Sequence, residues 1–363
     1  MILKYEEIDR EEWSRLVRTS VTGTWFQTPE AYEFFASMPE FFRPFVVAVE
    51  RVNDLTNERT LRGICVGYVT KEKNAIKQYF TRRAIIIGGP CLADDCSMDE
   101  AEALMKALRQ QLIIGNWSLV NAPIYIETRN FNDYSKWKEA FEKVGFEYQK
   151  HLNFHVDCTD KKAMWDRMRE NRKRQIRKVT NEGVKELTNE SLTNESLTNE
   201  GVSEQDVREW YAILAELYRT KVKTPLWPVG FFLEAYKQGV GKFLLVKHEG
   251  KVIGGSMVVV MSEGMNELRN EGCVYEWFEC GMNAQYKDQY PSVCATYAGM
   301  CYAAEHGCAR YDMMGAGVPG VPYGVRDFKA EFGGKMVEHG RFLYVCKPWL
   351  YRIGKLGVKL LKN

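Results

Sequence analysis

Residues 292–314 read Ser-Val-Cys-Ala-Thr-Tyr-Ala-Gly-Met-Cys-Tyr-Ala-Ala-Glu-His-Gly-Cys-Ala-Arg-Tyr-Asp-Met-Met. The spacing of apolar residues predicts a helix over 292–305 that ends at Gly307, followed by a strand over 310–314. The apolar run 274–280 just upstream predicts another strand. A strand, a helix and a second strand in this order indicate an α/β fold for this part of the chain.

The same succession of elements occurs in both halves of the chain. In the second half, strands are predicted over 154–157, 243–247 and 252–261, and helices over 163–179 and 207–219. In the first half, strands are predicted over 45–50, 63–69, 84–87 and 124–127, and helices over 98–112 and 137–144. We therefore expect an α/β (α+β) protein with two domains, 1–150 and 151–345, each a mixed sheet flanked by helices.

Composition limits the classes of function. The chain has 363 residues, which suits two domains, and a formal charge of +2, which argues against a general DNA-binding protein. Its N-terminus has acidic residues within the first six positions, unlike a signal peptide, and no apolar run reaches about 18 residues. None of the ten cysteines forms a C-x-x-C pair. We expect reduced, buried cysteines, no metal site and a cytoplasmic location.

Two segments stand apart from the predicted domains. Residues 186–203 contain a five-residue repeat that fits neither a helix face nor a strand face, so we interpret them as a surface-loop insertion. Residues 346–363 predict a basic amphipathic helix that begins at Pro348. Two interpretations of this helix stay open: it docks on the protein through its apolar face, or it contacts the inner face of the membrane peripherally.

Two further stretches suggest ligand binding. On the predicted helix 163–179, Arg172 shares a face with apolar residues, and Arg174 and Arg177 lie near the C-terminal end. This pattern is typical either of a solvated face or of a site for a nucleotide, a tRNA or a pyrophosphate-linked substrate. Residues 315–334 are rich in glycine, which either connects two elements or lets the backbone approach a ligand closely.

Four stretches together resemble the Fem family of peptidyltransferases, which adds amino acids from aminoacyl-tRNA to the stem peptide of cell-wall precursors. They are Trp25-Phe-Gln-Thr-Pro-Glu30, the basic run 172–178 with Gly183-Val184, the segment 303–312 with Gly315, and Phe328-Lys-Ala-Glu-Phe-Gly-Gly334. The chain departs from the family where Tyr32 and Phe34-Phe35 replace a lysine. The resemblance implies two acetyltransferase-like (GNAT-like) domains in tandem.

The resemblance also implies a reaction and a set of site residues. An amine would attack an activated acyl group, and Lys329 would stabilise the oxyanion that forms. Tyr286 and Asp312 are expected to relay protons or to orient groups, although a structural role at the end of a strand is the favoured interpretation of Asp312. We assign substrate binding to a set of basic and aromatic residues: Arg172, Arg174, Arg177, Trp277, Tyr323, Arg326 and Phe328.

The expected partners follow from the same resemblance. The donor would be aminoacyl-tRNA and the acceptor a peptidoglycan precursor or another amine, with no tightly bound cofactor. A rival interpretation is an acyl-CoA-dependent N-acetyltransferase of the same fold, although residues 286–292 lack the glycines that such enzymes carry before the corresponding helix. A second rival, from another class, is a non-catalytic module that binds RNA or the cell envelope.

Overall fold

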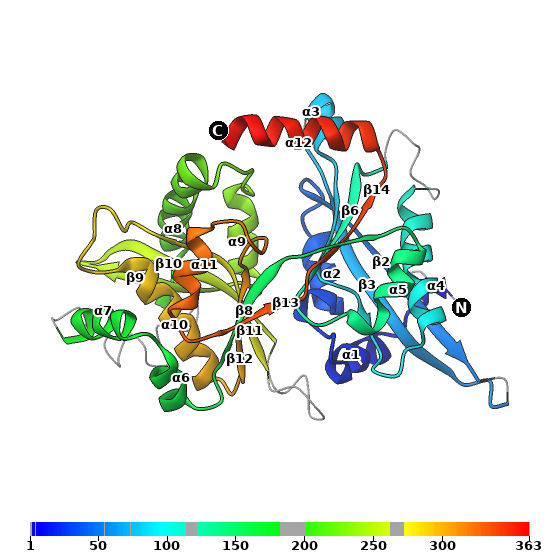
Figure 1. The fold of residues 1–363 in the computed structure, drawn as a ribbon, viewed down its shortest axis with the longest axis horizontal. Helices are drawn as coiled ribbons and strands as arrows, with labels where there is room; N and C mark the ends of the chain where they lie inside the picture. Colours follow the sequence, from blue (N-terminus) through cyan, green and yellow to red (C-terminus); the bar gives the residue numbers. More distant parts are fainter. Residues whose placement is uncertain are drawn as a thin grey trace. The chain divides into compact units, whose positions relative to one another are not determined.

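The computed structural model describes residues 2–3, 5–53, 55–72, 74–113, 122–181, 201–261 and 272–362 (Figure 1). The chain divides into two compact units. Unit 1 contains Met1–His151 and Glu338–Asn363, and unit 2 contains Leu152–Met265 and Glu271–Val337. The repeat-bearing residues 186–200 of the expected loop insertion lie outside the described residues.

Unit 1 is a mixed sheet with helices. Its strands follow the order β1-β2-β3-β4-β6-β14-β7, and β5 pairs with β3. The strands are β1 (Ile2–Leu3), β2 (Phe42–Val52), β3 (Arg59–Thr70), β4 (Ala84–Gly88), β5 (Cys91–Leu92), β6 (Tyr125–Asn130), β7 (Glu147–Gln149) and β14 (Arg341–Val345). The helices are α1 (Arg10–Thr19), α2 (Pro29–Ala36), α3 (Ala75–Thr81), α4 (Met98–Ile113), α5 (Lys138–Lys143) and α12 (Pro348–Lys362).

Unit 2 is a second mixed sheet, with the order β13-β8-β12-β11-β10-β9. The strands are β8 (Leu152–Asp157), β9 (Lys242–His248), β10 (Lys251–Met261), β11 (Cys273–Gly281), β12 (Arg310–Gly315) and β13 (Lys335–Glu338). The helices are α6 (Lys161–Arg167), α7 (Glu170–Asn181), α8 (Glu204–Leu217), α9 (Val229–Lys237), α10 (Pro291–Glu305) and α11 (Gly324–Ala330). The turn between β9 and β10 has positive φ at both Glu249 and Gly250, the geometry of a tight hairpin.

The two sheets share one topology. In unit 1, β2, β3 and β4 are antiparallel, α4 follows, and β6 lies parallel to β4. In unit 2, β9, β10 and β11 are antiparallel, α10 follows, and β12 lies parallel to β11. In each sheet, the strand on the other side of this last strand is distant in sequence: β14 pairs with β6 in unit 1, and β8 pairs with β12 in unit 2. The repeated topology confirms the predicted α/β class with two similar mixed sheets.

The aromatic–glutamine motif near the N-terminus has a structural role in unit 1. Gln27 is fully buried, and its side-chain amide donates to the carbonyls of Val66 and Ile87, each at 3.0 Å. Its carbonyl oxygen accepts from the amide of Val66 at 2.8 Å. Because a buried amide must satisfy both its donor and its acceptor groups, this one side chain joins β3 to β4.

Two elements differ from the sequence-based expectation. The segment assigned to one helix over 163–179 is α6 followed by α7, because Met168 adopts an extended backbone and the Arg169 amide bonds to the Glu331 carbonyl at 3.0 Å. The expected second domain extended to residue 345, whereas β14 pairs with β6 and β7 in the sheet of unit 1. Its Phe342 is completely buried, with its ring 4.8 Å from that of Phe141.

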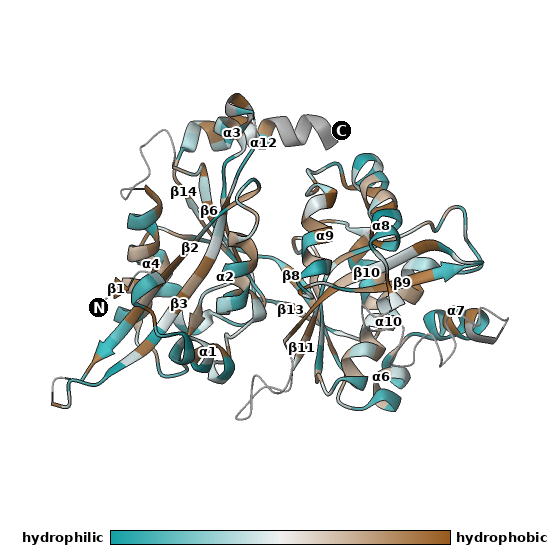
Figure 2. Ribbon diagram, turned by 180° about the vertical axis from the view of Figure 1, so that it is seen from behind, coloured by the Kyte–Doolittle hydropathy of each residue, from teal (hydrophilic) through white to brown (hydrophobic). Residues whose placement is uncertain are grey.

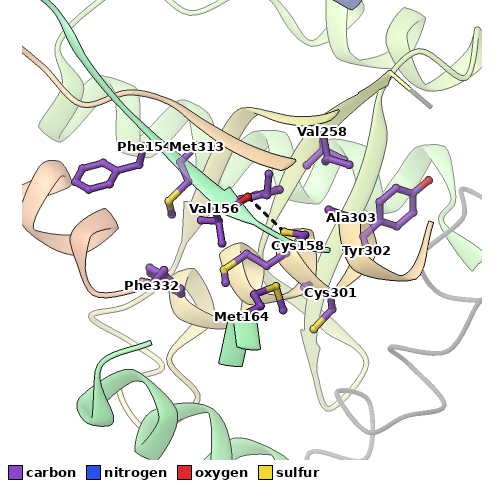
Figure 3. Close-up of a cluster of buried hydrophobic side chains, with 14 of the residues drawn as sticks. Phe154, Val156, Cys158, Met164, Val258, Cys301, Tyr302, Ala303, Met313 and Phe332 are labelled. Carbon is purple, nitrogen blue, oxygen red and sulfur yellow. Dashed lines mark hydrogen bonds between the residues drawn. The ribbon is translucent and has the colours of Figure 1, made fainter. Parts of the chain in front are cut away.

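The core of unit 2 joins buried side chains of the sheet to those of helices α6, α7 and α10 (Figure 3). Its members come from distant parts of the chain and include Phe154, Val156, Met164, Met300, Met313 and Phe332. All ten cysteines are unpaired, and nine of them are buried. Burial raises the pKa of the Cys294 thiol to about 12, so this thiol stays protonated at neutral pH.

The C-terminal helix begins at Pro348 as expected, but its contacts differ from the docked interpretation. Leu350 is buried in unit 1, and the ring of Tyr351 lies 5.5 Å from that of Tyr125. Trp349, Ile353 and Leu356, which form an apolar stripe on one face of the helix, are all more than half exposed. Within the part of the chain that the structure describes, no helix has the length and hydropathy to cross a bilayer.

Candidate active site

The candidate site lies in unit 2, where β11 and β12 separate. The two strands pair in parallel only from Cys273–Arg310 to Tyr275–Asp312, although β11 continues to Gly281 and β12 to Gly315. On its other side, β12 pairs with β8 and shifts register between Asp312 and Gly315. Met314 adopts φ +57°, a left-handed conformation that is costly for a residue with a side chain. This bulge re-aims the backbone at the end of β12.

Lys329 uses the backbone that the bulge exposes. Its ammonium group donates to the carbonyls of Met313 and Gly315, the latter at 3.1 Å, and the residue is only 9% exposed. Burial lowers the pKa of Lys329, while the nearby carboxylates of Glu276, Asp312 and Glu279 act in the opposite direction. An ammonium has three donors. Two bonds to carbonyls leave one donor for a ligand.

Two glutamates of β11, Glu276 and Glu279, are among the carboxylates near Lys329, and the sequence analysis did not identify either of them as a site residue. Glu276 is buried and accepts hydrogen bonds from Tyr311 at 2.7 Å and Thr296 at 3.0 Å. Burial raises the pKa of Glu276, and it raises the pKa of Glu279 to about 8, with the charge of Glu276 as a further cause. The signal was present in the sequence: acidic residues are seldom placed in an apolar strand such as 274–280 without a partner or a function.

Asp312 lies beside Lys329 but is held by other groups. It is fully buried, and it accepts hydrogen bonds from the side chain of Asn153 and the amide of Met314, each at 2.8 Å. His155 lies 3.2 Å away. Burial alone would raise the pKa of Asp312, but His155 and the hydrogen bonds outweigh it and the pKa falls. These contacts suit a structural carboxylate that fixes the bulge of β12.

Arg172 and Phe328 form a packed pair rather than an open binding surface. The guanidinium of Arg172 lies 4.6 Å from the ring centre of Phe328 and 3.0 Å from the carboxylate of Glu331. It also donates to Gln175 at 2.7 Å. Arg172 therefore attaches α7 to α11, the helix that carries Lys329. The partner of Arg172 is a carboxylate of this chain rather than a phosphate of a substrate, so its contribution to the site is through the position of α11.

Arg326 and Tyr323 organise the glycine-rich segment. Arg326 donates to the carbonyls of Ala316 and Val321, each at 3.0 Å, and of Val318 at 2.5 Å. Tyr323 is exposed, and a side chain at Gly317 would meet its ring at 2.9 Å. Gly317 also has φ +78°, which favours glycine. The guanidinium thus fixes the loop between β12 and α11, and Tyr323 remains accessible to a substrate.

The other expected site residues lie elsewhere in unit 2. Arg174 and Arg177 are exposed on α7; Arg174 bonds to Asn171 at 2.9 Å, and Arg177 lies 3.7 Å from Glu170. Trp277 follows Glu276 on β11 but packs into an aromatic group, 5.4 Å from the ring of Phe231. Tyr286 packs against a separate core cluster that includes Val246 and Ile253. The structure thus groups Lys329 and Asp312 and does not bring Tyr286 to them.

A close contact between α10 and β12 couples the core to the site. A Cβ atom at Gly299 would lie 2.4 Å from the hydroxyl of Tyr311 and 2.6 Å from its ring. That hydroxyl is the donor to Glu276, and Tyr311 is completely buried. We therefore expect Gly299→Ala to lower the free energy of unfolding by about 1–3 kcal/mol through overpacking and to reduce activity as well.

Equilibrium unfolding in urea measures this effect, with Gly324→Ala as the matched control. Gly324 also lies in a helix of unit 2, but nothing lies within 4 Å of an added Cβ there. We expect this control to change the unfolding free energy by less than about 1 kcal/mol. Equal stabilities of Gly299→Ala and the original protein would contradict the tight α10–β12 contact.

Comparisons with known proteins agree with this arrangement. A family model described as the FemAB family matches residues 264–358, which include β11, α10, β12 and α11. The crystal structure of FemX superposes with a TM-score of 0.61 at 12% sequence identity, covering 97% of this chain and 99% of that chain. No curated protein sequence matches this chain.

Two other solved structures are less similar. L-PGS from Bacillus licheniformis has a TM-score of 0.48 at 11% identity, covering 90% of this chain and 91% of that chain. A tandem GNAT protein from the clavulanic acid biosynthesis pathway has a TM-score of 0.47 at 6% identity, covering 95% and 98%. The FemAB match confirms the predicted family resemblance and, with it, an enzyme of the acyltransferase class. The likeness to FemX confirms the tandem fold.

Proposed function

From this family resemblance and fold, we propose that the protein transfers an aminoacyl group from aminoacyl-tRNA to an amine of a cell-wall peptide precursor. The observation that carries the proposal is the buried ammonium of Lys329, held on two backbone carbonyls beside three carboxylates with one donor left over. A positive charge in so enclosed a place is costly unless it is paired and hydrogen-bonded, so a lysine buried here is a candidate for a role in the reaction. Stabilisation of a transient oxyanion is such a role.

The reaction would proceed by direct attack. The acceptor amine forms a C–N bond to the aminoacyl carbonyl carbon. The oxyanion of the tetrahedral intermediate accepts a hydrogen bond from the third N–H of Lys329. The ester C–O bond to the ribose then breaks. The amine loses a proton and the ribose oxygen gains one. Glu279 is our candidate to accept the proton that the amine loses, because its pKa of about 8 lies near neutral pH. Positioning of the two substrates supplies much of the remaining rate.

The start of α10 argues against the acyl-CoA alternative. In acetyltransferase-like folds, backbone amides at this helix end would bind the pyrophosphate of the donor. Here Pro291 has no N–H, and the amide of Ser292 bonds to the side chain of Asn283 at 3.2 Å. The side-chain amide of Asn283 also donates to the Ser292 hydroxyl at 2.7 Å. These contacts use donors that a pyrophosphate would need.

Mass spectrometry of reaction mixtures tests the proposed function. The purified protein is incubated with a set of aminoacyl-tRNAs, with acyl-CoAs and with amine acceptors that include cell-wall precursors. We expect an acceptor adduct with the mass of an amino acid only in the presence of charged tRNA. An adduct formed from acyl-CoA would favour the rival enzyme, and no adduct under any condition would favour a binding module. The proposed substrates place the reaction in the cytoplasm.

The basic helix α7 gives a prediction about donor binding. Arg174 and Arg177 are the basic side chains of this helix that are exposed, and we expect them to contact phosphates of the donor. Replacing both with glutamine should weaken tRNA binding and reduce the slope of log K against log salt by about 0.7–0.9 per lost contact, because fewer counterions are released. Binding is measured at several salt concentrations by fluorescence anisotropy.

The matched control is the pair Arg208→Gln and Arg219→Gln. These arginines are also exposed in unit 2, and they lie 3.8 Å from Glu204 and 2.7 Å from Glu216. We expect the control to keep the affinity and salt slope of the original protein. If both pairs of substitutions had the same effect, the basic residues of α7 would be ordinary solvated charges with no specific role in tRNA binding.

A further inference from the structure

Helices α3 and α12 of unit 1 both leave apolar side chains exposed. On α12 these are Trp349, Ile353 and Leu356, at 55%, 53% and 63% exposure, and on α3 they are Ile76 and Phe80, at 73% and 50%. Figure 2 shows apolar residues on both helices. Grouped exposed apolar residues of this size are typical of surfaces that bind a partner or a membrane. We call these five residues the apolar patch.

The two helices are attached to each other through the sheet of unit 1. The amide of Ile124 bonds to the carbonyl of Arg82, just after α3, at 2.8 Å, and the amide of Lys347, just before α12, bonds to the carbonyl of Ile124 at 3.0 Å. The ammonium of Lys347 lies 5.1 Å from the ring centre of Tyr79 on α3. The apolar patch therefore lies on two neighbouring elements.

The packing of each helix leaves the patch outward. On α12, Leu350 is buried, and the helix rests on the sheet through Leu350 and Tyr351. A hollow of about 370 Å³ lies between the first turn of α12 and β14, lined by residues that include Leu343, Val345 and Tyr351. On α3, the buried Gln78 donates to the carbonyl of Thr70 at 3.0 Å. Both helices are thus held from one side.

The two segments that carry the patch have charge of one sign. Residues 73–83, which contain α3, include four basic residues and no acidic one, and residues 346–363 include five basic residues and no acidic one. Arg352 and Lys355 are exposed on α12, beside the apolar stripe. Since the whole chain carries a formal charge of only +2, these two segments concentrate positive charge.

We propose that α3 and α12 form a docking surface for an anionic lipid bilayer. Tryptophan and aliphatic side chains enter the boundary between head groups and acyl chains, and flanking lysine and arginine side chains contact anionic head groups. The pairing of apolar and basic residues argues for this partner over the others. A second copy of the chain would bring two surfaces of like charge together, and a nucleic acid would leave Ile76, Ile353 and Leu356 in water.

Co-sedimentation with vesicles tests the proposal on the full chain. One set of vesicles contains phosphatidylcholine alone. The other contains roughly 35% phosphatidylglycerol, which gives its surface a negative charge. We expect binding to the anionic vesicles and at least about tenfold weaker binding to the neutral ones. We also expect salt at about 0.5 M to weaken binding to the anionic vesicles, because salt screens exposed charges.

Two sets of variants separate the apolar and electrostatic contributions. Replacing Trp349, Ile353 and Leu356 with serine should weaken binding to anionic vesicles at least about tenfold. Replacing Arg352 and Lys355 with glutamine should weaken it about fivefold per residue.

The matched control is serine at Val21, Val52 and Leu55, which are also exposed apolar residues of unit 1. This control should bind as the original protein does.

Several outcomes would overturn the proposal. They are equal binding to neutral and anionic vesicles, unchanged binding of the serine variant, and an effect of the control equal to that of the variant. A dimer in solution that the serine variant abolishes would assign the patch to a second copy. Loss of tRNA binding in the Arg352 and Lys355 variant, with vesicle binding kept, would assign it to RNA. Thermal unfolding of every variant checks that the fold is retained.

Discussion

Lys329→Met will lower the rate of aminoacyl transfer by about 10²–10³-fold while the protein stays folded. The reason is that a positioned donor to an oxyanion contributes this much to a transfer reaction, and the ammonium of Lys329 is fixed by the carbonyls of Met313 and Gly315. Methionine has a similar length and no charge. The change should therefore reduce kcat more than it raises KM, because the lost interaction exists mainly in the transition state.

The measurement is steady-state kinetics of the transfer reaction with purified variants. The matched control is Lys335→Met, since Lys335 is exposed on β13 and carries the same functional group. Its kcat should stay within about threefold of the original value. Circular dichroism and unfolding in urea follow the fold of both variants. A folded Lys329→Met protein with kcat within threefold of the original would remove this lysine from the mechanism.

Glu279→Gln will make the protein more stable at alkaline pH. The pKa of Glu279 is raised from its ordinary 4.5 to about 8, first by burial and then by the charge of Glu276. Between these two values the folded protein keeps a proton that the unfolded chain has released, so stability falls as the pH rises through this window. A neutral glutamine avoids this loss. One pKa unit corresponds to about 1.4 kcal/mol, so the effect is on the order of a few kcal/mol.

Unfolding free energies at pH 4.5, 6.5 and 8.5 test this prediction across roughly the window in which Glu279 titrates. The difference between Glu279→Gln and the original protein should be small at the lowest pH and largest at the highest. Glu209→Gln on α8 serves as control for the change from glutamate to glutamine itself. A Glu279→Gln protein that is less stable at every pH would mean that the carboxylate is stabilised by contacts, contrary to its raised pKa. The same variant should transfer more slowly if Glu279 accepts the proton.

The sequence by itself determined many of the strands and helices and the order in which they follow one another. Apolar periodicity placed strands at 274–280 and 310–314 and the helix between them, because these patterns depend only on neighbouring residues. Glycine marked the turns correctly, as at Gly307 with φ +68°, since its backbone freedom is a local property. The resemblance at 328–334 singled out Lys329 before any contact was known.

Only the tertiary structure decided which of those residues meet. Strand β14 joins the sheet of unit 1 because Phe342 is buried against Phe141 there, a contact between residues about 200 positions apart. Arg172 faces Glu331 and Phe328, so its charge serves the packing of α11. Glu276 and Glu279 become unusual acids only when the folded chain buries them, which raises the pKa of both carboxyl groups. Burial and pairing depend on distant residues, and local patterns in a sequence do not contain that information.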